Sequence, residues 1–185
     1  INDEIRNPKL WSPETPNLYQ LTVQLKNPNG EIVDEILQNV GFKWVGISNK
    51  KEFLLNGKPY KLKGASRHQD YKNIGNALTD AMHVKDIELM KAMGCNFLRI
   101  AHYPQDPAIY DACDRLGLVA WSEIPVVDKV VNNKTFFDNS ALMMKEMMLQ
   151  NFNHPSIAIW GYHNEVRNLD ATSIAHAKML DSLTK

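Results

Sequence analysis

The chain is poor in the features that mark several large classes of protein. Its 185 residues include two cysteines, too few for a disulfide framework. No stretch approaches the ~18 consecutive apolar residues of a membrane-spanning helix. Lysine plus arginine and aspartate plus glutamate number 21 each, so the formal net charge is zero. Because there is also no basic run of five or more residues, nucleic acid and anionic membranes are poorly supported as partners.

Nucleotide-binding and export signals are missing as well. No Gly-x-Gly-x-x-Gly and no Walker-type loop is present, which argues against a nucleotide-binding fold. The first residues, Ile1 to Glu4, lack an initiating Met and a signal-peptide pattern, so we expect a segment of a longer protein. The bacterial cytoplasm and the periplasm are both expected as possible locations. Cys95 and Cys113 lie in apolar contexts, which favours buried free thiols.

The most informative stretch that is present runs from Ile157 to Glu165. Apolar residues typical of a buried strand lead into a polar cluster whose last member is a carboxylate. A carboxyl group at the mouth of a buried strand can be partly desolvated, and it then keeps its proton near neutral pH. Glu165 is therefore a general-acid candidate, with a structural ion-pair partner as the alternative. Acid–base cleavage of a glycoside also needs a second carboxylate.

The N-terminal quarter of the chain reads as antiparallel β-structure. Residues 18–25 alternate apolar and polar side chains, as a half-buried strand does. Asn27-Pro28-Asn29-Gly30 is strong turn chemistry, and residues 31–40 read as the returning strand. Since two strands alone are marginal in water, we expect this hairpin to belong to a larger sandwich. Residues 53–60, with Asn56-Gly57 at the centre, predict a second short hairpin.

Beyond residue 60 the pattern changes to alternating strands and helices. Short strands are predicted at residues 62–66, 97–100, 118–121 and 157–160. Helices are expected from Asp80 to Gly94, from Asp106-Pro107 to Gly117, and from Ser140 to Phe152. Such alternation predicts an α/β fold with a parallel sheet and right-handed crossovers. Its polar residues collect where the strands end, which is the ligand side of both barrels and open sheets. They are Arg67, His68, Arg99, His102, Glu123, Asn164 and Glu165.

Several of these segments resemble glycoside hydrolase family 2, the family of β-galactosidases and β-glucuronidases. The resemblance covers residues 10–166, nearly the whole chain. It implies that residues 1–43 are the C-terminal strands of an immunoglobulin-like sandwich. Residues 44–185 would then be strands one to four of a TIM (α/β)8 barrel. The matching segments are residues 10–19, 67–70, 96–104, 113–118 and 153–156, followed by Asn164-Glu165.

The resemblance implies a retaining β-glycosidase with a role for each matched residue. Glu165 would be the general acid/base, and Asn164 would bind the sugar 2-hydroxyl. Arg99 would lie beside the nucleophile, a glutamate on strand seven that the chain does not contain. We therefore expect the chain alone to be inactive, and its open half barrel to self-associate as a homo-oligomer. His68, His102, Arg67 and Asp70 would line the sugar site, which takes a β-linked oligosaccharide or glycoside.

Several alternatives stay open. Arg67–Asp70 resembles the β-galactosidase branch more than the β-glucuronidase branch, so galactoside stands first and glucuronide second. The chain could instead be a catalytically inactive carbohydrate-binding or scaffold piece. No cofactor is expected, although Glu123 matches a position that helps to bind magnesium in some β-galactosidases. The family pattern has a histidine two residues later, where this chain has Pro125. A zinc site at His68, His102 and His163 lacks a metal-binding spacing.

Smaller features receive structural interpretations. His163 is expected to orient its neighbours. Trp121 and Trp160 are expected in the barrel core rather than as sugar platforms. The glycosylation sequon at Asn133 occurs easily by chance. Met143, Met144, Met147 and Met148 are spaced as the buried face of a helix.

Overall fold

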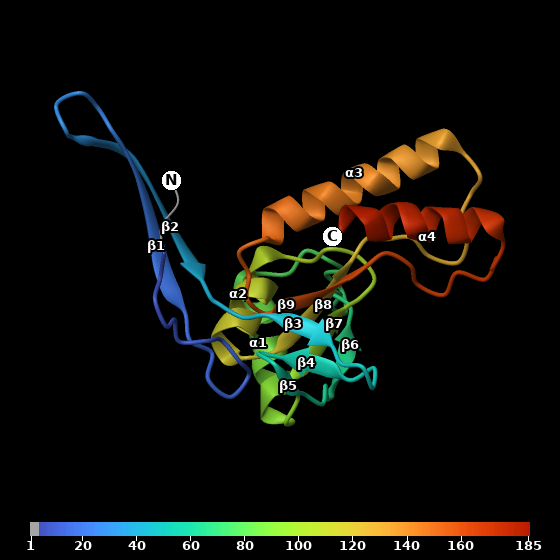
Figure 1. Ribbon diagram of the computed structural model, residues 1–185, viewed down its shortest axis with the longest axis horizontal. Coiled ribbons are helices and arrows are strands. Elements are labelled where there is room, and N and C mark those ends of the chain that lie inside the picture. The colour runs from blue at the N-terminus through green and yellow to red at the C-terminus, as the bar shows by residue number, and fades with distance from the viewer. Residues whose placement is uncertain (1–3) are drawn as a thin grey trace.

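The computed structural model describes residues 4–185, which form three sheets and four helices (Figure 1). One sheet is a hairpin, one is a small antiparallel sheet, and one is a four-stranded parallel sheet. In chain order the elements are β1 (Tyr19–Lys26), β2 (Ile32–Val40), β3 (Val45–Ile47), β4 (Phe53–Leu55), β5 (Lys58–Pro59), β6 (Gly64–Arg67), α1 (Asp80–Ala92), β7 (Phe97–Ile100), α2 (Pro107–Leu116), β8 (Val119–Glu123), α3 (Lys134–Asn151), β9 (Ile157–Gly161) and α4 (Ala171–Leu183).

The predicted N-terminal hairpin is present as β1 and β2, and it projects from the rest of the molecule (Figure 1). Tyr19 pairs with Val40 and Val23 with Ile36, which places alternate apolar side chains on one face. The expectation of a half-buried strand is wrong within the described residues: Val23 is 53% and Ile36 60% exposed. The reason is that no part of residues 4–185 covers the outer half of this face. Membership of an immunoglobulin-like sandwich stays a prediction.

The parallel sheet has the order β6-β7-β8-β9, which confirms the predicted alternation of strands and helices. Ser66, Arg99, Trp121 and Ile159 lie side by side across it. Consecutive parallel neighbours joined by helices are the arrangement of the first half of an (α/β)8 barrel. β6 and β9 are its edge strands. Arg67 and Glu123 are the last residues of β6 and β8 rather than residues that follow them.

Two apolar clusters fix the helices against this sheet. The first joins α1 and α2 to the strands and is formed by Ile87, Leu98, Ile100, Ile109, Cys113, Ala120 and others. The second joins α3 and α4, which lie side by side in Figure 1, through Met144, Met147 and Leu180. The methionines therefore pack as expected. Cys113 is buried and Cys95 half-buried, both are free, and burial raises the pKa of the Cys113 thiol.

Helix termini follow local sequence signals. Asp106 caps α2 by accepting a hydrogen bond from the Ala108 amide at 2.9 Å, and Gly117 ends the helix at φ +74°. The prediction that the third helix begins at Ser140 is wrong, because α3 begins at Lys134. Asn133, the residue of the glycosylation sequon, is its N-cap and accepts hydrogen bonds from Thr135 and Phe136 amides. Phe136 and Phe137 in its first turn pack against the cluster that joins α3 and α4, so the helix begins earlier than the spacing of the methionines indicates.

Helix α4 has no counterpart among the predicted elements. Its start is a capping box: Asp170 accepts from the Ser173 amide, and the Ser173 hydroxyl accepts from the Asp170 amide. That box is legible in the sequence. The helix matters for the site because it carries His176, which is fully buried. Within residues 4–185, none of the helices has the length and apolarity needed to cross a bilayer.

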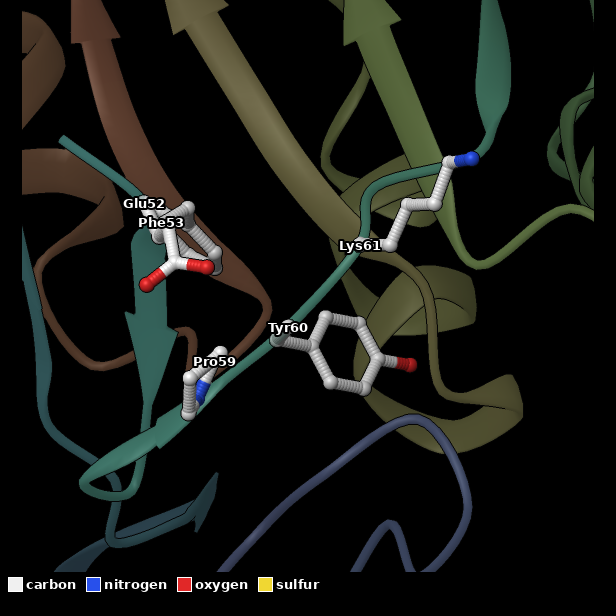
Figure 2. A pocket seen from close by; sticks show the side chains of 5 residues that line it. All are labelled: Glu52, Phe53, Pro59, Tyr60 and Lys61. Carbon is white, nitrogen blue, oxygen red and sulfur yellow. The ribbon is translucent and has the colours of Figure 1, made fainter. Parts of the chain in front are cut away.

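The amino ends of the parallel strands are closed by the N-terminal segment and the small β3-β4-β5 sheet. Trp11 is fully buried against Leu55 and Val119, and its Nε1 donates to the Asp114 carbonyl at 2.8 Å. Figure 2 shows a pocket at this end, lined by Glu52, Phe53, Pro59, Tyr60 and Lys61. The polar residues predicted to form a site lie at the opposite, carboxyl ends of the strands.

Candidate active site

The centre of the carboxyl-end cluster is an ion pair between β7 and β8. The Arg99 guanidinium lies 3.0 Å from both carboxylate oxygens of Glu123 and stacks over the Trp121 ring at 4.7 Å. The Glu123 side chain is only 1% exposed, so its charge is compensated within the protein. The Arg99 side chain is 23% exposed, so part of it stays accessible to solvent.

Two further predicted residues join this pair. Arg99 Nη2 donates to Asn164 Oδ1 at 2.9 Å, and His102 Nδ1 donates to Glu123 Oε1 at 2.7 Å. Because Arg99 fixes the amide oxygen, the Nδ2 group of Asn164 is left to donate elsewhere. Because His102 Nδ1 is engaged by Glu123, Nε2 is the ring nitrogen that is left for another partner. Hydrogen-bonded partners 21 to 65 positions apart in the sequence thus form one network.

Gly161 makes room for this network. A Cβ at Gly161 would collide with Trp121 Nε1 and would lie 2.7 Å from Glu123 Cβ. Gly161 pairs with Glu123 in the sheet, so a larger side chain would displace the carboxylate or the indole. Trp160 packs against both apolar clusters, as expected of a core residue. Trp121 lies beneath the Arg99 guanidinium, and its core role stays a prediction.

His68 lies beside the network on the loop after β6, and Asp70 follows it on the same loop. The rings of His68 and His102 are 5.1 Å apart in an edge-to-face arrangement, and His68 Nδ1 is 3.5 Å from the Tyr103 hydroxyl. Asp70 is exposed, and none of the described residues pairs with its carboxylate. Both side chains are exposed, on the loop that follows the carboxyl end of β6.

The structure does not bring Arg67 into this network. Its guanidinium is 7% exposed and donates to Asp86 Oδ2 at 2.7 and 2.9 Å and to Gln105 Oε1 at 2.7 Å. Gln105 in turn donates to the carbonyls of Arg67 and Ala101. The sugar contact by Arg67 stays a prediction, but its donors already join the end of β6 to α1 and to the loop after β7.

Glu165 follows the network at the end of β9, and its carboxylate is exposed. The premise that burial desolvates this group is wrong for the described residues, because β9 is an edge strand with a neighbour on one side only. Its backbone has φ +50°, the left-handed region that few non-glycine residues adopt. The preceding Asn164 amide donates to the Val126 carbonyl at 2.8 Å, and Asp128 donates back to Asn164. Glu165 thus has an exposed side chain on a segment whose backbone is held by hydrogen bonds.

His163 turns away from the network and pairs with α4. Its Nε2 lies 2.9 Å from Nδ1 of His176, and the two rings stack 5.2 Å apart at 6°. The expected role of orienting its neighbours fits this contact. His68, His102 and His163 do not form a group of potential metal ligands within residues 4–185.

The residues at Glu123 do not fit a magnesium ion. Both carboxylate oxygens already accept from Arg99 or His102, and Pro125 supplies no ligand. Within residues 4–185 one group of potential ligands comes together elsewhere: Asp111, Asp114 and His154 at the amino end of the sheet. There His154 Nδ1 donates to Asp114 Oδ2 at 2.6 Å and the Ser156 amide to Oδ1, so Asp114 is already satisfied.

Sequence reasoning missed the residues that support the site from other elements. Asp86, Gln105 and His176 lie on or beside helices, and each acts through a partner distant in sequence. Gly161 could have been found, because a glycine at the end of a buried strand signals a close approach of another group.

Comparisons with known proteins agree with this geometry. The family model described as "Glycosyl hydrolases family 2, TIM barrel domain" matches residues 45–185, and "Glycosyl hydrolases family 2" matches residues 2–43. A putative β-glucuronidase of Formosa agariphila is 46% identical over 162 residues, covering 88% of this chain and 20% of that protein. A β-galactosidase of Enterobacter cloacae is 36% identical over 168 residues, covering 87% of this chain and 16% of that protein.

Solved structures give the same picture. The crystal structure of a Bacteroides uniformis β-glucuronidase superposes with a TM-score of 0.87 at 44% identity. That match covers 95% of this chain and 23% of the other. The chain spans about a fifth of the length of the curated relatives it matches.

Proposed function

Because the chain belongs to glycosyl hydrolase family 2, we propose that it carries the acid/base half of a retaining β-glycosidase active site. The observation that carries the proposal is the Arg99–Glu123–Asn164 network. It holds Asn164 by its amide oxygen and presents the adjacent Glu165 carboxylate at the open edge of the sheet. Residues from three separate strand ends serve one small region, as a barrel active site requires.

The chemistry assigns a task to each side chain. Glu165 protonates the glycosidic oxygen as the leaving group departs, and its carboxylate later takes a proton from the attacking water. Asn164 Nδ2 donates to the sugar 2-hydroxyl. His102 Nε2, His68 and Asp70 accept from or donate to other hydroxyls. In retaining enzymes the nucleophile lies ~5 to 5.5 Å from the acid. We propose that another part of the protein, outside these residues, supplies it.

For the substrate we propose a β-glucuronide, ahead of a β-galactoside. The support is that the more similar relatives and solved structures are named β-glucuronidases, whereas β-galactosidases are less similar. This reverses the order suggested by Arg67–Asp70, whose first member is buried and cannot by itself discriminate between sugars. Comparison of kcat/KM for aryl β-glucuronides and aryl β-galactosides tests the order.

The acid/base role is tested by Glu165→Ala in the longest protein that contains this chain. We expect kcat for a phenyl glycoside to fall by about 10²–10⁴-fold, since its leaving group needs a proton. A dinitrophenyl leaving group departs without protonation, so the first step of hydrolysis of a dinitrophenyl glycoside should slow far less. Added azide should restore the rate of the second step, because it replaces the water that Glu165 would activate. Glu88→Ala on the exposed face of α1 is the matched control. An equal loss on both substrates would refute the assignment.

The isolated 185-residue chain is expected to show no turnover, because it supplies one of the two carboxylates. Turnover by the chain that Glu165→Gln abolishes would overturn this expectation and would favour a complete site. A catalytically inactive binding or scaffold role predicts instead that the longer protein is also inactive towards both glycosides.

We also propose that the isolated chain self-associates. Each of β6 and β9 has a pairing partner on one side only, and exposed edges promote pairing with other chains. The hairpin adds an exposed apolar face at Leu21, Val23 and Ile36. Light scattering should show species larger than a monomer, and a stable compact monomer would contradict the proposal.

A further inference from the structure

We infer that the His163–His176 pair is an anchor that positions the Asn164–Glu165 segment and that releases this segment when the pair takes up a proton. The segment is held from two sides. On one side the Asn164 amide donates to the Val126 carbonyl, and the Arg167 amide donates to the Asp128 carbonyl, both at 2.8 Å. On the other side, the His163 side chain reaches α4 and contacts His176 at 2.9 Å.

The environment of His176 makes this anchor sensitive to protonation. His176 is fully buried, with Phe136 and Phe137 of α3 packed on its ring. Its Nε2 atom is buried without a hydrogen-bond partner among the described residues. A buried N–H without an acceptor is rarer and more costly than a buried acceptor without a donor. His176 is therefore best satisfied with its proton on Nδ1, donated to His163 Nε2.

Either way of adding a proton then disrupts the pair. A proton on His163 Nε2 reverses the shared hydrogen bond and forces the His176 proton onto Nε2, where no acceptor lies. A proton placed directly on His176 Nε2 buries a charge as well as an unpaired donor. Burial lowers the pKa of His176 to about 4, with His163 as the smaller cause, and burial also lowers the pKa of His163.

Charged residues on the surrounding elements do not offset this effect. On α3 Lys134 pairs with Asp138, in the flanking loops Arg167 pairs with Asp128, and on α4 Asp181 pairs with Lys185. Asp170 is engaged in capping α4. The charged group that lowers the pKa of His176, after burial itself, is His163. The remaining charged residues of these elements are Lys129, Lys145, Glu146, Glu165 and Lys178.

The sign of the pH dependence follows from these lowered pKa values. Between pH 6.5 and about 4 the released state binds more protons than the anchored state. The anchor is therefore complete at neutral pH and is lost as the pH falls through this window. The position of the Asn164–Glu165 backbone is the direct consequence. Its meaning for catalysis rests on the proposed function.

Amide hydrogen exchange and imidazole ¹⁵N shifts of the 185-residue chain test the inference without any turnover, so the result is independent of the proposed activity. The reporter amides are Asn164, Asp128 and Arg167, each hydrogen-bonded across the anchored segment. After correction for intrinsic rates, their opening constant should rise by up to about tenfold per pH unit below pH 6.5. Amides within α2 serve as the internal control and should stay protected.

Three variants sharpen the test. His163→Ala should expose the reporter amides already at pH 7. His163→Gln offers a hydrogen-bonding group near the Nε2 position but cannot titrate, so it should keep protection and flatten its pH dependence. His154→Gln, at the other end of the sheet, should leave the pH dependence unchanged. At pH 7 the ¹⁵N spectrum should show His176 protonated at Nδ1. Unchanged protection in His163→Ala, or a His176 proton on Nε2, would overturn the inference.

Discussion

Arg99 and Glu123 are paired through two oxygens at 3.0 Å, across adjacent parallel strands and 24 residues apart in sequence. The pair also holds Asn164 and His102, so four side chains share one compensated charge system. Such a system is formed before any ligand arrives, which limits the reorganisation that binding requires.

Glu123→Ala should lower the free energy of unfolding by about 2–4 kcal/mol. The loss of one partner leaves the other charge uncompensated, and this is milder than in a fully buried pair because Arg99 is 23% exposed. Urea denaturation of the chain measures the change. Glu88→Ala, which removes an exposed glutamate from α1, is the control and should alter stability by less than about 0.5 kcal/mol. Equal effects of the two substitutions would contradict the assigned role.

Arg67→Lys should destabilise the chain by about 2–3 kcal/mol even though the charge is kept. A lysine cannot replace a guanidinium that bonds Asp86 through two nitrogens and Gln105 through a third. Arg115→Lys on the exposed face of α2 is the matched control. Thermal or urea unfolding distinguishes them. If Arg67→Lys proved neutral, the guanidinium would be free for a sugar contact.

Gly161→Ala tests the close approach at the end of β9. The added methyl group would collide with the Trp121 indole and crowd Glu123, so we expect a loss of about 1–3 kcal/mol. Gly46→Ala in β3 is the control, because no atom lies within 4 Å of a Cβ at that position. Tryptophan fluorescence during unfolding reports both the stability and the indole environment. Tolerance of alanine at both positions would show that the strand can shift.

Because of Lys43, the free energy of unfolding should rise at alkaline pH. Its Nζ donates to the Ile157 carbonyl at 2.8 Å, and burial lowers its pKa from 10.5 to about 8. Between these values the unfolded chain binds the extra proton, so unfolding becomes less favourable as the pH rises. We expect the free energy of unfolding to rise by about 1–2 kcal/mol between pH 8 and 9.5.

Two comparisons isolate the lysine. Lys43→Met should abolish the rise, whereas Lys50→Met in an exposed turn should keep it. The window must end near pH 9.5, because burial raises the pKa of Tyr60 and Tyr110 and reverses the sign at higher pH. A flat stability profile in the unsubstituted chain would contradict the prediction.

Local sequence signals were sufficient for most of the fold. Cap residues and apolar spacing predicted α1, α2 and the four parallel strands, because those signals act within one or two turns of chain. They missed the start of α3, which the Asn133 cap marks, and the whole of α4, which the capping box of Asp170 and Ser173 marks. Strand ends also predicted the residues of the candidate site, since parallel strands bring their carboxyl ends to one edge.

The sequence by itself determined the alternation of strands and helices, the placement of polar residues at strand ends, and the family to which the chain belongs. Only the tertiary structure decided how those residues are used. It paired Arg99 with Glu123, assigned Arg67 to Asp86, joined His163 to His176, and left Glu165 exposed on an edge strand. The physical reason is that donors, acceptors and burial depend on partners 13 to 65 residues away, which no local pattern specifies.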